Sequence, residues 1–156
     1  MEVVWRRKPV KAYRPRAATV TSKMMAAVKN RDSKAEMLLR RQLHSCGLRY
    51  RLHSSRLIGK PDIVFSKARL AIFVDGDFWH GRALVEEGVE GLKRGLRTQR
   101  SQWWIAKISK TVSRDVFVTQ SLELDGWSVQ RFWESDVLKG VKSISSKIEA
   151  TLKERQ

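Results

Sequence analysis

Two aspartates stand at the ends of two short apolar segments of the chain. Asp62 directly precedes the apolar residues 63–65, and Asp75 directly follows the apolar residues 70–74. Because only a short turn joins these segments, we predict a buried β-hairpin that brings Asp62 and Asp75 to neighbouring strands. Two close carboxylates, helped by the backbone carbonyl of Val74, offer the oxygen ligands that Mg²⁺ prefers. A metal there could polarise a phosphodiester and activate water, whereas the alternative is a pair of solvated turn acids.

A histidine and two large aromatic side chains follow the second aspartate. Phe78, Trp79 and His80 lie where the predicted strand leaves the sheet. His80 could serve as the general base that takes a proton from the attacking water. Aromatics at such a position are ordinarily core residues, but beside an active site on a basic protein they could be wedges between base pairs. This neighbourhood favours a site for phosphodiester hydrolysis over a pair of solvated acids.

The composition of the chain points to nucleic acid as its partner. The 156 residues include 32 Lys plus Arg and 16 Asp plus Glu, which gives a net charge of +16. Such a surplus suits a polyanion, of which nucleic acid is the commonest. A membrane surface is a weaker candidate, because no stretch resembles a spanning helix. The single cysteine, Cys46, excludes an internal disulfide and a cysteine zinc cluster, so we expect a cytoplasmic, nucleoid-associated bacterial protein.

One domain is expected to position these residues, and a basic arm is expected to precede it. Residues 1–20 are rich in arginine and lysine and contain two prolines. This segment is interpreted either as a flexible arm that follows DNA phosphates or as a solvated tail. Residues 21–156 form the expected domain, and 42% of the chain is apolar, which is enough for a real core.

Periodicity and turn residues predict an α/β domain with a mixed central sheet flanked by helices. Ser33 and Glu36 have the form of a capping box, which starts a helix that should end at Gly47. The glycine-rich residues 81–100 are predicted to form a long loop with broken helix. The other expected helices cover residues 21–29, a segment that begins near 102, residues 113–124 (ending at Gly126) and residues 143–156. The expected strands cover residues 48–52, 63–65, 70–74 and 127–133.

Taken together, these motifs resemble the very-short-patch-repair (Vsr) family of DNA endonucleases. The resemblance rests on the stretches Gly59-Lys60-Pro61-Asp62-Ile63-Val64 and Phe73-Val74-Asp75-Gly76-Asp77-Phe78-Trp79-His80-Gly81. It covers residues 20–138 and extends, in matching order, through Ser22-Lys23-Met24-Met25, Glu36, Trp103-Trp104, Ser113-Arg114-Asp115, Gly126-Trp127 and Trp133-Glu134. The resemblance implies a restriction-endonuclease-like fold.

Carried over position by position, the resemblance assigns catalytic roles. Asp62 would be the principal metal ligand, helped by the carbonyl of Val74, and His80 would be the general base. Glu36 would hold a metal-bound water, and Asp115 would hold the histidine. Related homing endonucleases share the order Glu, Asp, any residue, His, Asp, which here reads Glu36, Asp62, Asp75, His80, Asp115. Structural alternatives exist for Glu36, which completes its capping box, and for Asp115, which could be an acid at a helix N-terminus.

The resemblance also implies contacts with DNA. Phe78, Trp79 and Trp104 would insert into the duplex beside the target, and Lys23 and Met25 would contact the DNA. For Trp104 the alternative is a place in the core.

The chain departs from the family's pattern in two places. Asp75 stands where the repair enzyme carries a histidine, so it could add a direct metal ligand. The family's structural zinc ligands correspond to four residues that cannot rebuild a zinc site, namely Asp77, Arg82, Leu84 and Ser135. We therefore predict that the protein holds no zinc, and that residues 81–100 are held by packing or stay loose until DNA binds.

The function expected from these observations is Mg²⁺-dependent nicking of one strand of double-stranded DNA by a monomer. The favoured target is a T:G mismatch left by deaminated 5-methylcytosine. One alternative is a homing, restriction or defence nickase without mismatch preference, which Asp75 and the missing zinc ligands favour. A second alternative is a non-catalytic DNA-binding module.

Overall fold

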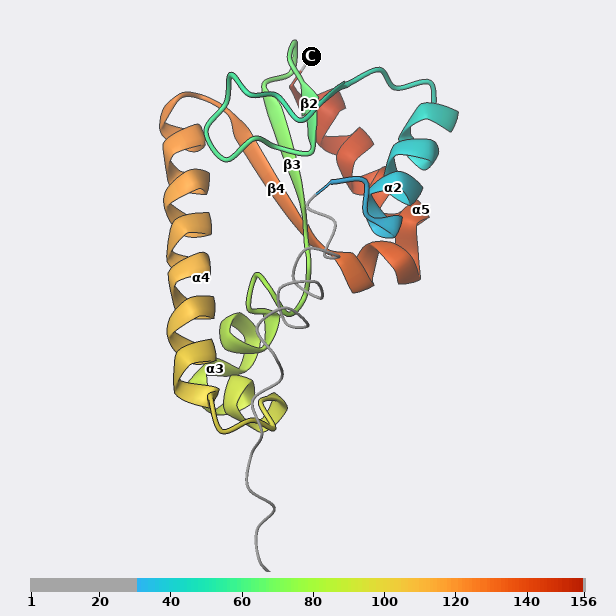
Figure 1. Cartoon of the computed structure of the whole chain (residues 1–156). Coiled ribbons are helices and arrows are strands. Elements are labelled where there is room, and N and C mark those ends of the chain that lie inside the picture. Colours follow the sequence, from blue (N-terminus) through green and yellow to red (C-terminus); the bar gives the residue numbers. More distant parts are fainter. Residues whose placement is uncertain (1–30, 156) are drawn as a thin grey trace, which may run out of the picture. The chain divides into compact units, whose positions relative to one another are not determined.

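A mixed β-sheet between two layers of helices forms the domain. The computed structural model describes residues 31–155, in which four strands are ordered β1-β2-β3-β4 (Figure 1). The strands are β1 (Arg51–Leu52), β2 (Ile63–Phe65), β3 (Leu70–Asp75) and β4 (Ser128–Trp133), and the helices are α2 (Lys34–Ser45), α3 (Arg82–Gly95), α4 (Ser101–Leu124) and α5 (Glu134–Glu154). The predicted α/β class with a mixed sheet is confirmed. The predicted basic arm and the helix over residues 21–29 lie outside the described residues.

The sheet changes from antiparallel to parallel pairing at β3. β1, β2 and β3 pair antiparallel, and Ile63 lies opposite Ile72, so the predicted hairpin is confirmed. β3 and β4 pair in parallel, with Leu70 opposite Ser128 and Asp75 opposite Trp133. Because these two strands run side by side to the same edge, the segments that leave β3 and β4 begin next to each other.

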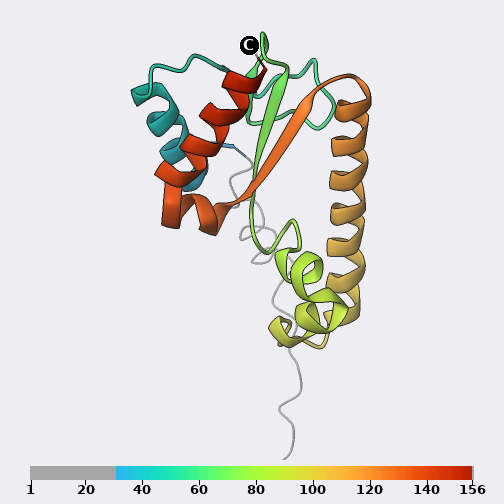
Figure 2. The same cartoon turned by 180° about the vertical axis from the view of Figure 1, so that it is seen from behind.

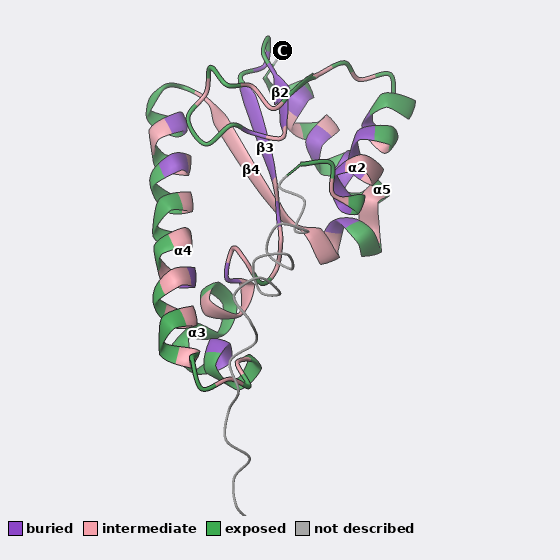
Figure 3. Ribbon diagram, viewed as in Figure 1, coloured by how far each residue is buried: buried purple, intermediate pink, exposed green. Residues whose placement is uncertain are grey.

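Helices cover both faces of this sheet. One core cluster joins α2 and α5 to the sheet through side chains such as Leu39, Leu43 and Ile148, all fully buried. On the other face, Val118 and Leu122 of α4 pack with Phe73 of β3. Figures 1 and 2 show α4 on one side of the sheet and α2 with α5 on the other. Figure 3 shows that β3 is mostly buried, whereas the outward side of α4 is exposed.

The start of α2 follows directly from its sequence. The Oγ of Ser33 accepts a hydrogen bond from the backbone N–H of Glu36 at 3.2 Å, as the capping box predicts. The helix ends at Ser45, and Gly47 adopts a φ of 78°, a left-handed conformation that suits glycine.

Several predicted boundaries are corrected. The long loop predicted for residues 81–100 is wrong over residues 82–95, which are helical, whereas the predicted break in this helix is found at Gly88, with φ 73° and ψ −171°. Buried Leu92 lies in the second part of α3. α4 is one helix of 24 residues, since no glycine or proline interrupts it. α5 begins at Glu134 rather than near residue 143, because Val137 already reaches the core before the bend at Gly140.

Three further observations concern the length of β1, the position of α3 and the hydropathy of the helices. The predicted strand over residues 48–52 shortens to Arg51–Leu52. α3 and the first part of α4 lie beyond the end of the sheet (Figure 1). Among residues 31–155, no helix is both long and apolar enough to cross a membrane.

Candidate active site

Asp62 sits at the entrance of β2, directly against β3. Its backbone N–H donates to the carbonyl of Ile72 at 3.0 Å, and its carboxylate accepts a hydrogen bond from the N–H of Val74 at 2.8 Å. Burial, together with the charges of Glu36 and Asp75, raises the pKa of Asp62 to about 6, although the Val74 N–H lowers it. The ionised form of Asp62 is therefore poorly stabilised where it lies, and a cation bound to Asp62 would stabilise it.

A second acidic group lies beside Asp62, on α2. Glu36 is buried, and its carboxylate approaches the Nε2 of His53 at 3.1 Å. The Nδ1 of His53 lies 3.8 Å from the Asp62 carboxylate, so this histidine stands between the two acids. Ligand atoms of Asp32, Glu36 and His53 lie within 4.8 Å of one another, a spacing that could hold a metal ion.

The guanidinium of Arg40 occupies the centre of this acidic group. It pairs with Glu36, contacts Asp32 at 2.6 Å and lies 2.7 Å from the Nε2 of His53. Arg40 thus already neutralises Glu36, whereas no described arginine or lysine pairs with Asp62. The difference makes Asp62 the better candidate for a metal ligand.

His80 and Asp115 form a hydrogen-bonded pair. Nδ1 of His80 lies 2.6 Å from the Asp115 carboxylate, which is supplied by α4, and 3.5 Å from that of Asp75. Burial lowers the pKa of His80, but the hydrogen bond to Asp115 and the charges of Asp75 and Asp115 outweigh it and raise the pKa above its ordinary value. With Nδ1 bound to Asp115, Nε2 is the nitrogen that can take a proton from water.

Arg131 of β4 connects the acids around His80. Its guanidinium donates two hydrogen bonds to Asp75, at 2.7 and 2.9 Å, and lies 3.2 Å from Asp115. The same group stacks over the ring of Phe73, 4.3 Å from its centroid. Because both oxygens of Asp75 already bind Arg131, a metal ion at Asp75 would have to share an oxygen with the guanidinium.

A cavity opens beside this cluster. Its volume is about 480 Å³, and Asp75, His80, Asp115 and Arg131 contribute to its wall, together with Val112 and other residues of α4 and β4. The pair of His80 and Asp115 is therefore accessible from the α4 side of the sheet.

The predicted aromatic wedges form one cluster. The ring centroid of Phe78 lies 5.3 Å from those of Trp79 and Trp104, and Trp79 and Trp104 are 5.7 Å apart. Trp103 packs on Trp104, and the ammonium of Lys107 lies over three of the indole rings at 4.8 to 5.6 Å. Phe78 is 44% exposed and Trp103 is 53% exposed, so the cluster presents apolar surface to solvent.

Three of the four positions that correspond to zinc ligands in the family come together. Asp77, Arg82 and Ser135 hydrogen-bond to one another, whereas Leu84 is not part of this group.

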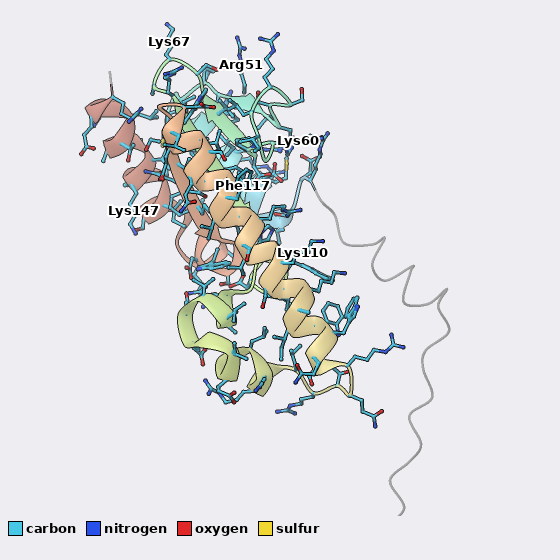
Figure 4. All side chains as sticks on the ribbon, turned by 90° about the vertical axis from the view of Figure 1, so that its left-hand side faces the viewer. Arg51, Lys60, Lys67, Lys110, Phe117 and Lys147 are labelled. Atoms are coloured by element: carbon cyan, nitrogen blue, oxygen red, sulfur yellow. The ribbon has the colours of Figure 1, made fainter. Side chains whose placement is uncertain are left out.

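Exposed basic side chains lie on several elements, and Figure 4 shows Arg51, Lys60, Lys67 and Lys110 projecting from the ribbon. The predicted DNA contacts Lys23 and Met25 fall outside the described residues.

Sequence reasoning missed three side chains of the site: His53, Arg40 and Arg131. His53 is one of the chain's three histidines and lies in the loop before Asp62, which was a usable signal. The partners of Arg131 are fixed by the parallel register of β3 and β4, which no local pattern reveals.

Comparison with known proteins gives a consistent picture. The profile of the family described as "DNA mismatch endonuclease Vsr" matches residues 17–86. The Type II nicking enzyme V.NmeDIP of Neisseria meningitidis serogroup C is 37% identical over 86% of this chain and 86% of its own length. The Type II nicking enzyme V.HpaIIP of Haemophilus parainfluenzae is 37% identical over 85% of this chain and 89% of its own.

The DNA mismatch endonuclease Vsr of Escherichia coli (strain K12) is 34% identical over 72% of this chain and 68% of its own length. Such identity over most of the chain accompanies a mixed sheet with helices on both faces, as expected for the restriction-endonuclease-like fold. The chain therefore belongs to the Vsr family and is a DNA endonuclease with that fold.

Proposed function

We propose that this endonuclease uses Mg²⁺ to nick one strand of duplex DNA at T:G mismatches left by deaminated 5-methylcytosine. One observation carries the proposal: Asp62, Asp75, His80 and Asp115, spread over much of the sequence, converge around the end of β3. Family membership in turn argues against a non-catalytic DNA-binding module.

The residues around Asp62 fit a hard divalent cation. A partly buried carboxylate that pairs with no described arginine or lysine, next to the backbone of Val74, suits the oxygen-rich donor set that Mg²⁺ prefers. Glu36 and His53 stand close enough to hold water beside that ion. Asp75 is the remaining candidate ligand. When bound, Mg²⁺ would polarise the scissile phosphate and offset the charge that develops on it.

The chain's own residues then handle the proton. Nε2 of His80 takes the proton of the attacking water, and Asp115 holds the ring at Nδ1 and stabilises the imidazolium that forms. The guanidinium of Arg131 contacts both Asp115 and Asp75 and holds these two carboxylates in place. The histidine beside them therefore has a fixed orientation. In this proposal Phe78, Trp79 and Trp104, which form one partly exposed cluster, insert into the duplex, and a mismatched step costs less to open than a matched one.

The test is nicking of a T:G duplex and its T:A counterpart, each labelled on one strand at a time, with Mg²⁺ or with EDTA. We expect one strand of the T:G duplex to be cut, only with the metal. The variant His80→Ala should lose activity, whereas His44→Ala, which removes an exposed histidine of α2, should keep it. Cutting with EDTA present, or full activity of His80→Ala, would contradict the proposal.

A second function has specific support. The relatives that are 37% identical are named Type II nicking enzymes, and Asp75 with its Arg131 partner differs from the histidine of the repair enzyme. On this alternative the protein is a homing, restriction or defence nickase without mismatch preference. Equal nicking rates on the T:G and T:A duplexes would favour it.

A further inference from the structure

The segment that carries Phe78, Trp79 and His80 is a closed turn. The backbone N–H of Arg82 donates to the carbonyl of Asp77 at 2.8 Å, and the Arg82 guanidinium lies 3.1 Å from the Asp77 carboxylate. Asp77 and Arg82, the two ends of the turn, are therefore joined twice, by a main-chain hydrogen bond and by an ion pair. Phe78, Trp79 and His80 lie between these two residues.

The same aspartate fastens the turn to α5. The Asp77 carboxylate accepts hydrogen bonds from the backbone N–H of Ser135 at 3.0 Å and from its Oγ at 2.6 Å. α5 has no side-chain cap of its own, since its N-cap residue is Trp133. Asp77 therefore satisfies an N–H of the first turn of α5 from a distant part of the chain, and its negative charge suits that end of the helix.

Arg82, the first residue of α3, also contacts the first turn of α5. Its guanidinium donates to the Oγ of Ser135 at 2.8 Å and to the carboxylate of Asp136 at 2.9 Å, and it lies over the ring of Trp133. Burial alone would raise the pKa of Asp77, but the hydrogen bonds from Ser135 and the contact with Arg82 lower it below its ordinary value. Asp77 is thus held as a carboxylate.

The far side of the turn has little room to move. Gly81 adopts a φ of 70°, and a Cβ there would lie 2.6 Å from Ile108 and 2.9 Å from Val112 of α4. α4 also supplies Asp115 to His80. The turn is therefore pressed against α4 on one side and tied to α5 on the other.

We propose that Asp77, Arg82 and Ser135, here called the Asp77 clamp, are positioning residues that set His80 and the aromatic cluster in place for nicking. The described polar contacts of the clamp do not include Asp62; the clamp acts through the turn that it closes. This inference rests on the proposed function of His80.

The first test separates positioning from metal binding. We expect Asp77→Ala to lower the single-turnover nicking rate at saturating DNA by about a hundredfold, because a misplacement of about 1 Å at a reacting group has an effect of that size. Asp77→Asn, which keeps an oxygen acceptor for Ser135, should lose about tenfold. The Mg²⁺ concentration for half-maximal rate should stay unchanged, because Asp62 and Val74 are untouched.

Ser135→Ala and a control complete the series. The effects of Asp77→Ala and Ser135→Ala should be less than additive, since the two residues contact each other. Glu86→Gln removes the charge of an exposed partner of Arg82 that lies outside the clamp, and this variant should nick at the wild-type rate. Wild-type rates for both Asp77→Asn and Ser135→Ala, or losses that only follow the fraction of folded protein, would overturn the proposal.

Hydrogen exchange provides a readout that does not depend on activity or on the stability of Asp77→Ala. In Ser135→Ala, we expect faster amide exchange in residues 76–82 and at the start of α5, with α2 and β3 unchanged. Unchanged exchange in residues 76–82 would overturn the clamp. If the wild-type protein does not nick DNA, the proposed function fails while the clamp is still judged by this measurement.

Discussion

The part of the domain around Asp62 and the part around His80 are stabilised by different interactions. Asp62 stands between strands whose side chains are buried on both faces, against a core that includes Leu39 and Ile72. His80 belongs to a turn held by polar contacts of partly exposed groups, such as Arg82 with Asp77. Hydrophobic burial thus fixes the part proposed to bind the metal, whereas hydrogen bonds and ion pairs fix the part proposed to contact DNA.

This difference has a physical consequence for function. A densely packed core tolerates little movement, which suits a carboxylate that must bind an ion at a set distance. Polar contacts between partly exposed groups are individually weak, so the position of the turn with Phe78 and Trp79 depends on several such contacts acting together. The account therefore predicts that the two parts respond differently to mutation and to pH.

Among the variants that keep both Asp62 and His80, the largest effect is expected at the hydrogen bond between His80 and Asp115. Asp115→Asn should lower the nicking rate by about a hundredfold or more, because the general base loses its orienting carboxylate. The pKa of His80 is raised by Asp115, so removing that charge should lower it. The acidic limb of the rate profile should then move to lower pH. A variant with reduced rate but an unshifted limb would show that Asp115 does not set the pKa of His80.

The next effect contrasts a core residue with an aromatic wedge. Leu39→Ala should cost about 2–5 kcal/mol of stability, because Leu39 is fully buried. Trp79→Ala should leave the melting temperature nearly normal and reduce nicking, since a lost stacking contact is worth about 1–3 kcal/mol on the DNA. Both variants should be measured by thermal melting and by nicking. A large fall in melting temperature for Trp79→Ala would make it a core residue and exclude the wedge.

A smaller effect concerns the stability cost of the Asp62 carboxylate. Its pKa is about 6 in the folded domain and lower in the unfolded chain. Ionisation of Asp62 therefore lowers the free energy of unfolding as pH rises, and this loss is complete above pH 6. Asp62→Asn should therefore be more stable than the wild type at pH 8 by up to about 3 kcal/mol, and equal to it near about pH 4. Urea unfolding at both pH values checks this. If Asp62→Asn were less stable than the wild type at pH 8, neighbouring groups would stabilise the ionised carboxylate of Asp62, and the prediction would be wrong.

The last effect in this order is the absence of any change in melting temperature when metal is removed. Native mass spectrometry should find no stoichiometric zinc, and EDTA should leave the melting temperature unchanged, because Asp77, Arg82, Leu84 and Ser135 do not form a zinc ligand set and three of them hydrogen-bond to one another. A structural zinc would couple strongly to folding. A melting temperature that falls with EDTA and returns with zinc would contradict this.

How much of this could be predicted from the sequence depends on the distance over which each feature is determined. The cap of α2 by Ser33 and the hairpin around Asp62 depend on neighbouring residues, and both predictions are confirmed, although the Glu36 carboxylate accepts from the N–H of Asp32 rather than of Ser33. For residues 82–95 the glycines correctly indicate a broken helix, but the predicted loop is too long, because packing against α4 keeps the segment helical on both sides of Gly88. Propensity alone does not include such tertiary contacts.

The cations of the site show the same limit. Arg40, Arg82 and Arg131 belong to a chain rich in basic residues, and nothing local distinguishes them from those on the surface. Their roles depend on which acid the fold brings to each guanidinium, as the parallel register of β3 and β4 does for Arg131 and Asp75. The acids could be found by their motif, but their partners required the structure.

The most direct test of the central claim compares Asp62→Ala with Asp125→Ala, in which an exposed aspartate at the end of α4 is removed. Single-turnover nicking of a T:G duplex with Mg²⁺ and DNA affinity without metal are measured for both. The account predicts that Asp62→Ala binds DNA at least as tightly as the wild type and does not cut it, because loss of a negative charge reduces repulsion of phosphate. Asp125→Ala should cut normally. Wild-type cutting by Asp62→Ala would contradict the account.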